Sequence, residues 1–312
     1  MIIAITLFGY ALLVMTGGAW LLRAAEWPAK APRLAITLWQ GLAASALLST
    51  AFGAAALSVR SRTVSTNLSA LLDVCATNLR ADYATPGGRT TSVIALGALA
   101  LIAARTIWGI TTALSQALRR RRRQLQILDL IAHRDPKLDV LVIDHPTPAA
   151  FCLSGRDRQV VLTNTALTRL SPEEVDAVLA HERAHLHGRH HLLLALNRGL
   201  ARAFPYVPLF TWGDEQVRRL VELAADDTAC RNHRRTVIAS AIRGLADTTT
   251  PTAAPAPRCD AIQLRLRRLT DRRTPLRLIT HSALYALIAA ELLGPAVLAA
   301  LPVLILIGTD YC

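Results

Sequence analysis

Cysteine is scarce in this sequence and is not arranged as a metal knuckle or a disulfide framework. The five residues are scattered along 312 positions, and no Cys-x-x-Cys pair occurs. They are Cys75, Cys152, Cys230, Cys259 and Cys312. Zinc knuckles and small secreted disulfide domains both need clustered cysteines. We therefore expect five free thiols, which fits a domain in a reducing compartment.

Charged residues are also few, at 18% of the chain, whereas hydrophobic residues reach 52% and gather in long runs. The charge is unbalanced, with 35 Lys and Arg against 22 Asp and Glu. A basic run such as Arg119–Arg123 occurs in nucleic-acid-binding proteins. Here it directly follows an apolar segment, which is the pattern of a cytoplasmic anchor under the positive-inside rule. No direct nucleic-acid partner is expected.

Four apolar runs are long enough to cross a hydrocarbon layer of ~30 Å at about 1.5 Å per residue. They cover residues 2–22, 34–59, 93–114 and 282–307. Nothing basic precedes Ile2, so a retained span is favoured over a signal peptide. The arginine clusters put the residues between the third and fourth runs inside, and both termini outside. We expect a multi-pass protein of the cell membrane, with the lipid bilayer as a partner.

Two of these runs carry a charge. Arg105 lies in the third and Glu291 in the fourth, each nine residues from the predicted cytoplasmic end. Charges inside a membrane are costly and usually pair or face a polar cavity. We hypothesise an Arg105–Glu291 ion pair; the alternative is that each side chain reaches the interface or meets water separately.

The residues between the third and fourth runs mix helical and strand patterns. Helices are expected at Gln124–His133, after the cap Ser171 with Pro172 and Glu174, and at Asp214–His233. Three strands are expected in this region. These are Leu138–Ile143, Phe151–Leu153 and Gln159–Thr163, the last two joined by a turn at Ser154–Arg158. Gln159–Thr163 is predicted to be an edge strand that could receive a peptide by strand addition.

The capped helix leads into His181-Glu182-Arg183-Ala184-His185. Histidines four residues apart project from one helix face and can hold two corners of a tetrahedral zinc site. Glu182 is then placed to act as general base on a water. A catalytic zinc normally takes three protein ligands, so the sequence must supply a third.

Two residues compete for that third position. Glu222 shares a helix face with Asp226, which could fix the tautomer of a ligand imidazole. The alternative for these acids is a solvated edge paired with Arg218 and Arg219. His191 completes a formal metzincin pattern, but that family needs a methionine downstream, and the two methionines stand at positions 1 and 15. Glu222 is therefore favoured over His191.

Together, these motifs and spans resemble the membrane gluzincins, more narrowly the M56 family of BlaR/MecR-type metalloproteases. The resemblance implies His181, His185 and Glu222 as ligands of one Zn²⁺ and Glu182 as general base. The M48 proteases share the motifs, but their HtpX-like members place two spans before the site and two after. Penicillin-sensing relatives carry an extracellular sensor after the last span, whereas this sequence stops at Cys312.

The fold expected is an α-helical membrane protein with a cytoplasmic α+β zinc protease domain of gluzincin type. Five regions are predicted along the chain. They are 1–118 with three spans, 119–246 as the protease domain, 247–260 as a Pro/Thr/Ala linker, 261–281 as a basic amphipathic segment near the membrane surface, and 282–307 as the fourth span.

The resemblance also implies a metalloendopeptidase in signal transduction. Its substrate would be a cytoplasmic protein such as a winged-helix repressor, or the protease itself. The alternatives are a quality-control protease of membrane proteins and a non-catalytic sensor or scaffold.

Overall fold

The computed structural model describes residues 2–58, 88–154, 159–246, 256–271 and 278–309. Four helices are long and apolar enough to cross a membrane. They are Ile3–Ala24, Pro32–Leu57, Thr90–Ile131 and Thr280–Ala300. Each overlaps one of the expected runs. Most of the 60–92 loop, most of the 247–260 linker and the turn at 155–158 lie outside the described residues.

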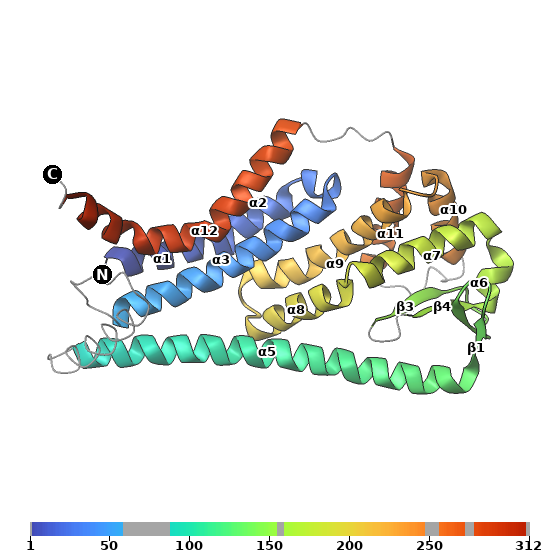
Figure 1. Ribbon diagram of the computed structural model, residues 1–312, viewed down its shortest axis with the longest axis horizontal. Helices are drawn as coiled ribbons and strands as arrows, with labels where there is room; N and C mark the ends of the chain where they lie inside the picture. Colours follow the sequence, from blue (N-terminus) through green and yellow to red (C-terminus); the bar gives the residue numbers. More distant parts are fainter. Residues whose placement is uncertain (1, 59–87, 155–158, 247–255, 272–277, 310–312) are drawn as a thin grey trace.

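The first two spans and the fourth pack around one another (Figure 1). Their elements are α1 (Ile2–Leu13), the π-helical turn η1 (Val14–Gly18), α2 (Ala19–Ala24), the short η2 (Trp27–Ala29), α3 (Pro32–Ser58) and α12 (Leu278–Thr309). The third is part of one continuous helix, α5 (Gly88–Ile131), which includes the arginine run and the stretch expected to be helical after it. Because α3 contacts α1, α5 and α12, it is the central helix of this bundle.

The Arg105–Glu291 ion pair expected from the sequence is wrong. Glu291 accepts a hydrogen bond from the Tyr10 hydroxyl at 2.7 Å. Arg105 donates from Nε to the backbone oxygen of Ala203 at 2.9 Å. The two charges have different partners because α12 packs on α3 and α1, while α5 packs on α3 and α8 (His190–Ala203).

A four-stranded sheet follows α5, in the order β1-β2-β4-β3. Its strands are β1 (Ala132–Asp135), β2 (Val140–Ile143), β3 (Ala150–Leu153) and β4 (Gln159–Thr163). Strand β4 pairs with β2 in parallel and with β3 antiparallel, so it is an inner strand and its prediction as an edge strand is wrong. Strand β3 forms that edge of the described sheet. Strand β1 was not expected, because its residues Ala132 and His133 continue the helical pattern of α5.

Five further helices complete the region with α8. They are α6 (Asn164–Arg169), α7 (Pro172–His187), α9 (Pro208–Ala229), α10 (Arg235–Ala246) and α11 (Ala256–Thr270). The start of α7 agrees with the sequence: the Ser171 hydroxyl accepts from the Glu174 backbone, and the Glu174 carboxylate accepts from the Ser171 backbone. Such reciprocal bonds satisfy two of the donors that a helix start leaves free, and fix where α7 begins.

Helices α8 and α9 form a hairpin that packs against the membrane helices α3 and α5 (Figure 1). Trp39 and Leu42 of α3 share one buried core with Leu200 of α8 and Phe210 of α9. At the crossing of α5 and α8, a Cβ on Gly109 would lie 2.3 Å from the Gly199 backbone oxygen. The backbones meet there because neither helix has a side chain in the way.

Gly109→Ala should therefore destabilise the α5–α8 crossing, by about 1–3 kcal/mol as for other overpacked sites. Gly97→Ala on the same helix is the matched control, since nothing lies within 4 Å of a Cβ there. Thermal unfolding of the purified protein in one detergent compares the two. Equal melting temperatures for the two variants would contradict the close approach.

Candidate metal centre

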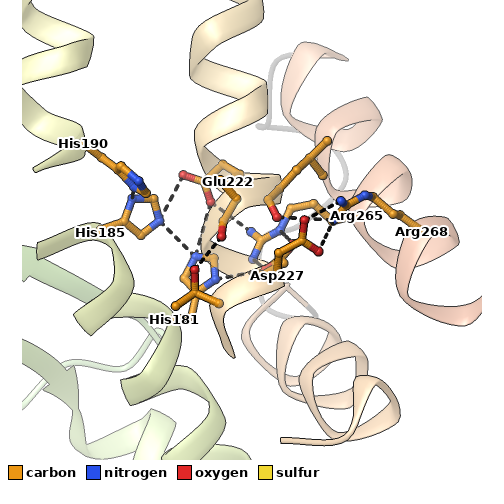
Figure 2. Close-up of polar contacts among 11 residues, drawn as sticks. His181, His185, His190, Glu222, Asp227, Arg265 and Arg268 are labelled. Carbon is orange, nitrogen blue, oxygen red and sulfur yellow. Dashed lines mark hydrogen bonds and ion pairs between the residues drawn. The ribbon is translucent and has the colours of Figure 1, made fainter. Parts of the chain in front are cut away.

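Three side chains from two helices meet beside the sheet (Figure 2). His181 and His185 project from the same face of α7, with their Nε2 atoms 3.1 Å apart. Glu222 comes from α9, with Oε2 3.5 Å from His181 Nε2 and Oε1 3.6 Å from His185 Nε2. The structure thus brings together the three residues that the sequence favoured as ligands.

The spacing of these atoms fits a tetrahedral zinc site. Zinc bonds to nitrogen and oxygen of about 2.0–2.1 Å imply ligand atoms separated by roughly 3.3 Å. The donor atoms of His181, His185 and Glu222 all lie within 4.8 Å of one another, and the three separations above fall on both sides of the ideal value. Two imidazoles and one carboxylate leave a fourth position free, as catalytic zinc sites do.

Asp226 lies behind His181, where the sequence predicted it. Its side chain is fully buried, and Oδ1 is 3.0 Å from His181 Nδ1. Nδ1 is nevertheless left without a well-aligned hydrogen bond, so the contact is set by charge and distance more than by direction. A carboxylate in this place favours the tautomer whose free nitrogen is Nε2, the atom that faces the proposed metal position.

His190 contacts the other ligand imidazole, and sequence reasoning had left it as a surface or outer group. Its Nδ1 is 3.0 Å from His185 Nδ1. Figure 2 shows the two rings edge to face beside Glu222. His191, the rival third ligand, is exposed on α8 and does not belong to the converging group.

Arg265 of α11 is the residue that sequence reasoning missed. It forms a two-point contact with Asp226, from Nε at 2.9 Å and from Nη2 at 2.7 Å, and its Nη1 lies 3.2 Å from Glu222. Arg268, one turn on, pairs with Asp227 at 2.7 Å and donates to the backbone oxygen of Ala29. This segment, predicted from the sequence to lie near the membrane surface, packs on α9 and α10, with Leu269 buried.

The sequence left open that Glu222 and Asp226 form a solvated edge paired with arginines of the same helix. Arg218 pairs with Asp214, at 2.8 and 2.9 Å, and not with Glu222 or Asp226. One signal for Arg265 was present in the sequence: a buried carboxylate on the apolar side of α9 needs a cation as partner.

The electrostatics keep the Glu222 and Asp226 carboxylates charged and the His185 imidazole neutral. Burial raises the pKa of Glu222, but His181, Arg265 and His185 more than offset this and bring it to about 2. Burial likewise raises the pKa of Asp226, and His181 and Arg265 bring it to about 2. Burial lowers the pKa of His185 to about 4, helped by the charge of His181. A neutral imidazole and an ionised carboxylate are the states that bind a metal.

His181 behaves differently. Burial lowers its pKa, but the Asp226 and Glu222 carboxylates outweigh this effect and raise the pKa to about 9. The carboxylates thus attract positive charge to the ring. A cation at Nε2 replaces the proton there, so metal binding releases a proton at neutral pH.

A cavity of about 560 Å³ opens beside the ligands. Its walls are β3, α7, α10 and α11, and Glu182 lies among the lining residues with His181, His185 and Glu222. Burial, and then the Glu222 charge, raise the pKa of Glu182, which makes it a stronger base. Cys152 lies beside Glu182. Burial, and then the negative charge of Glu182, raise the pKa of the Cys152 thiol to about 12. Cys152 is therefore a neutral thiol and not a nucleophile.

Asp226→Asn should weaken zinc binding by about 10–100-fold, because the group that orients a ligand imidazole loses its charge. Asp214→Asn is the matched control: Asp214 is another buried acid of α9 that pairs with arginine, and it does not touch the ligands. Competition with a chromophoric chelator measures both affinities. A similar loss in both variants would mean that Asp226 acts only on the stability of α9.

Comparison with known proteins agrees with this chemistry. Residues 114–258, from the end of the third span into α11, match Peptidase family M48. No solved structure matches the chain. The narrower resemblance to the M56 family is not confirmed. M48 peptidases are zinc metalloproteases, and the residues of this chain that resemble them include His181, His185 and Glu222, the three side chains that converge in the structure.

Proposed function

We propose that the protein is a membrane-embedded zinc metalloendopeptidase that hydrolyses peptide bonds of a cytoplasmic protein, in signal transduction. One observation carries the proposal: two imidazoles and a carboxylate converge at 3.1–3.6 Å, in a cavity that also holds Glu182. The match to family M48 supports the metallopeptidase activity. The M56 resemblance is what suggests the signalling role.

In this mechanism His181, His185 and Glu222 would hold the zinc, which would supply a Lewis acid for the scissile carbonyl and for the attacking water. Glu182 accepts a proton from that water and then donates it to the leaving amine nitrogen. Asp226 keeps His181 in the correct tautomer. Arg265 keeps Asp226 and Glu222 ionised, so that both acids remain in place through the cycle.

The substrate backbone is best accommodated along β3. Ala150, Phe151 and Cys152 of this strand line the cavity, and its partner among the described strands is β4 alone. An extended peptide added to the open side of β3 would form main-chain hydrogen bonds and pass beside Glu182. This replaces the earlier expectation that β4 receives the substrate.

Quality control of membrane proteins is a second candidate function, and the M48 match is the observation that favours it. The two functions differ in the number of substrates. Signalling needs one target, such as a winged-helix repressor or the protease itself, whereas quality control needs many misfolded ones.

Quantitative proteomics of protein fragments, in cells with wild type and with Glu182→Gln, tests the proposal. Loss of fragments from one cytoplasmic protein in the variant supports signalling. Loss of fragments from many membrane proteins supports quality control. An unchanged fragment pattern and an unchanged phenotype would favour the third function, a non-catalytic sensor or scaffold, and contradict the peptidase.

A further inference from the structure

The loop that joins α8 to α9 lies far from the metal centre and beside the middle of a predicted span. It consists of Phe204, Pro205, Tyr206 and Val207, and from Ala203 to Gly213 no residue is charged. Tyr206 is 95% exposed. An uncharged hairpin tip with an aromatic side chain facing outward is unusual for a protein surface in water.

The depth of this tip follows from its contact with α5. Ala203, at the end of α8, accepts from Arg105 at 2.9 Å. The Ala203 backbone also packs against α5 at Gly109, where a Cβ would lie 3.2 Å from the Ala203 nitrogen. Gly109 precedes Leu114, the inner end of the predicted third span, by five residues, which is about 8 Å of helix, and Arg105 precedes it by nine, which is about 13 Å. Since the hydrocarbon layer is ~30 Å thick, the tip beyond Ala203 lies in its inner half.

We propose that the α8–α9 hairpin is a membrane-inserted wedge, whose tip at residues 204–207 contacts lipid in the inner half of the bilayer. The surface continues that of the membrane helices. Leu101, Ile107 and Trp108 of α5, all within about one turn of Arg105, are more than half exposed. The bilayer that covers these side chains also reaches the neighbouring tip.

The backbone of the turn is suited to such a place. Peptide groups in a hydrocarbon layer must be satisfied within the protein. Pro205 and Pro208 have no N–H to satisfy. Val207 donates to the Phe204 oxygen, and the Val207 oxygen accepts from Phe210 and from Thr211. Arg105 donates to the oxygen of Ala203, which gives this intramembrane charge a structural role at the end of α8.

The charged residues nearest the tip are directed away from it or neutralised. Arg202 extends along α5 and donates to Gln116 at 3.0 Å, so its guanidinium reaches the level of the inner end of the third span. Long basic side chains behave in this way near membrane interfaces. On α9, Asp214 is paired with Arg218 at 2.8 Å and with Arg198 at 3.4 Å.

The wedge sets the height of the metal centre. Glu222 follows Pro208 by fourteen residues of α9, or about 21 Å of helix. A tip about 8–13 Å deep therefore leaves Glu222 roughly 8–13 Å beyond the inner edge of the hydrocarbon layer, for a helix along the bilayer normal. This inference depends on the four spans and not on peptidase activity.

Spin-label accessibility in phospholipid nanodiscs tests the wedge. A label at Tyr206→Cys, in full-length protein whose five native cysteines are alanine, is compared with labels at Leu101→Cys and Glu173→Cys. Leu101 is exposed on α5 one turn from Arg105, and Glu173 is exposed at the start of α7. We expect residue 206 to match residue 101, with a ratio of oxygen to nickel-chelate collisions several-fold above that of residue 173.

A collision ratio at 206 equal to that at 173 would overturn the wedge, whatever residue 101 shows. An aqueous signal at 101 would overturn it as well, because the third span would then lie outside the bilayer. If the cysteine-free chain fails to fold, a photoreactive phenylalanine analogue at position 206 replaces the label. Lipid adducts found by mass spectrometry then support the wedge, and their absence with adducts present at 101 contradicts it.

Discussion

Glu182→Gln is expected to lower the rate of peptide hydrolysis by about 10²–10⁴-fold, the usual contribution of a general base. Glutamine keeps the size of the side chain and cannot accept the proton from water. Because Glu182 is not among the three converging ligands, the variant should bind as much zinc as wild type. Cleavage of unfolded casein by purified protein, together with elemental analysis of the same sample, measures both quantities.

The matched control is Glu173→Gln, an exposed acid of the same helix. Its activity should equal that of wild type. Full activity in Glu182→Gln would contradict the assignment of the base. A loss of zinc with the loss of activity would mean that Glu182 supports the ligands and does not act on water.

Arg265→Ala is expected to lower the free energy of unfolding by roughly 3–5 kcal/mol, the range for breaking a buried ion pair. The Asp226 side chain is 1% exposed and that of Arg265 is 17% exposed, so water cannot replace the guanidinium easily. The variant leaves one buried carboxylate without its two-point partner and a second, Glu222, without its nearest cation. Chemical unfolding of detergent-solubilised protein, followed by circular dichroism, measures the change.

Arg267→Ala is the comparison, since Arg267 is exposed on the same helix α11. A loss confined to Arg265→Ala would establish α11 as part of the site. If both variants unfold like wild type, α11 does not hold the acids in solution. A wild-type free energy of unfolding in Arg265→Lys would indicate that charge alone is needed, and not the two-point geometry.

The sequence was sufficient where the chemistry is local. The capping box of Ser171 and Glu174 and the pair His181 and His185 depend on residues three or four positions apart, so their spacing alone predicts the geometry. Glu222 and Asp226 were recognised for the same reason. Their approach to α7 could be inferred only because zinc chemistry requires a third ligand.

The sequence did not predict contacts between residues that lie far apart in the chain. Arg265 follows Asp226 by 39 positions and reaches it across the linker region. Its helix gathers Ile262, Leu266 and Leu269 on one face and carries several arginines, a pattern that a membrane-surface helix shares. The order of β3 and β4 in the sheet is equally a tertiary property, because both strands are short and largely apolar and neither carries a local mark of an edge position.

The packing of the α8–α9 hairpin on α3 and α5 could not be predicted from the sequence, for a related reason. An apolar helix face can pack on the core of a soluble domain or on a membrane helix, and periodicity does not separate the two. The close approach of Gly109 on α5 and Gly199 on α8, two residues 90 positions apart in the chain, determines that α8 packs on α5. The same packing explains Arg105, for which the sequence offered only Glu291 as a partner.

The central claim is that one metal is held by two imidazoles of α7 and one carboxylate of α9. Elemental analysis of purified full-length protein tests it directly, in wild type, Glu222→Ala and His191→Ala. The account predicts one zinc per chain in wild type and in His191→Ala, and almost none in Glu222→Ala. Wild type without zinc, or zinc that survives Glu222→Ala and is lost in His191→Ala, would contradict it.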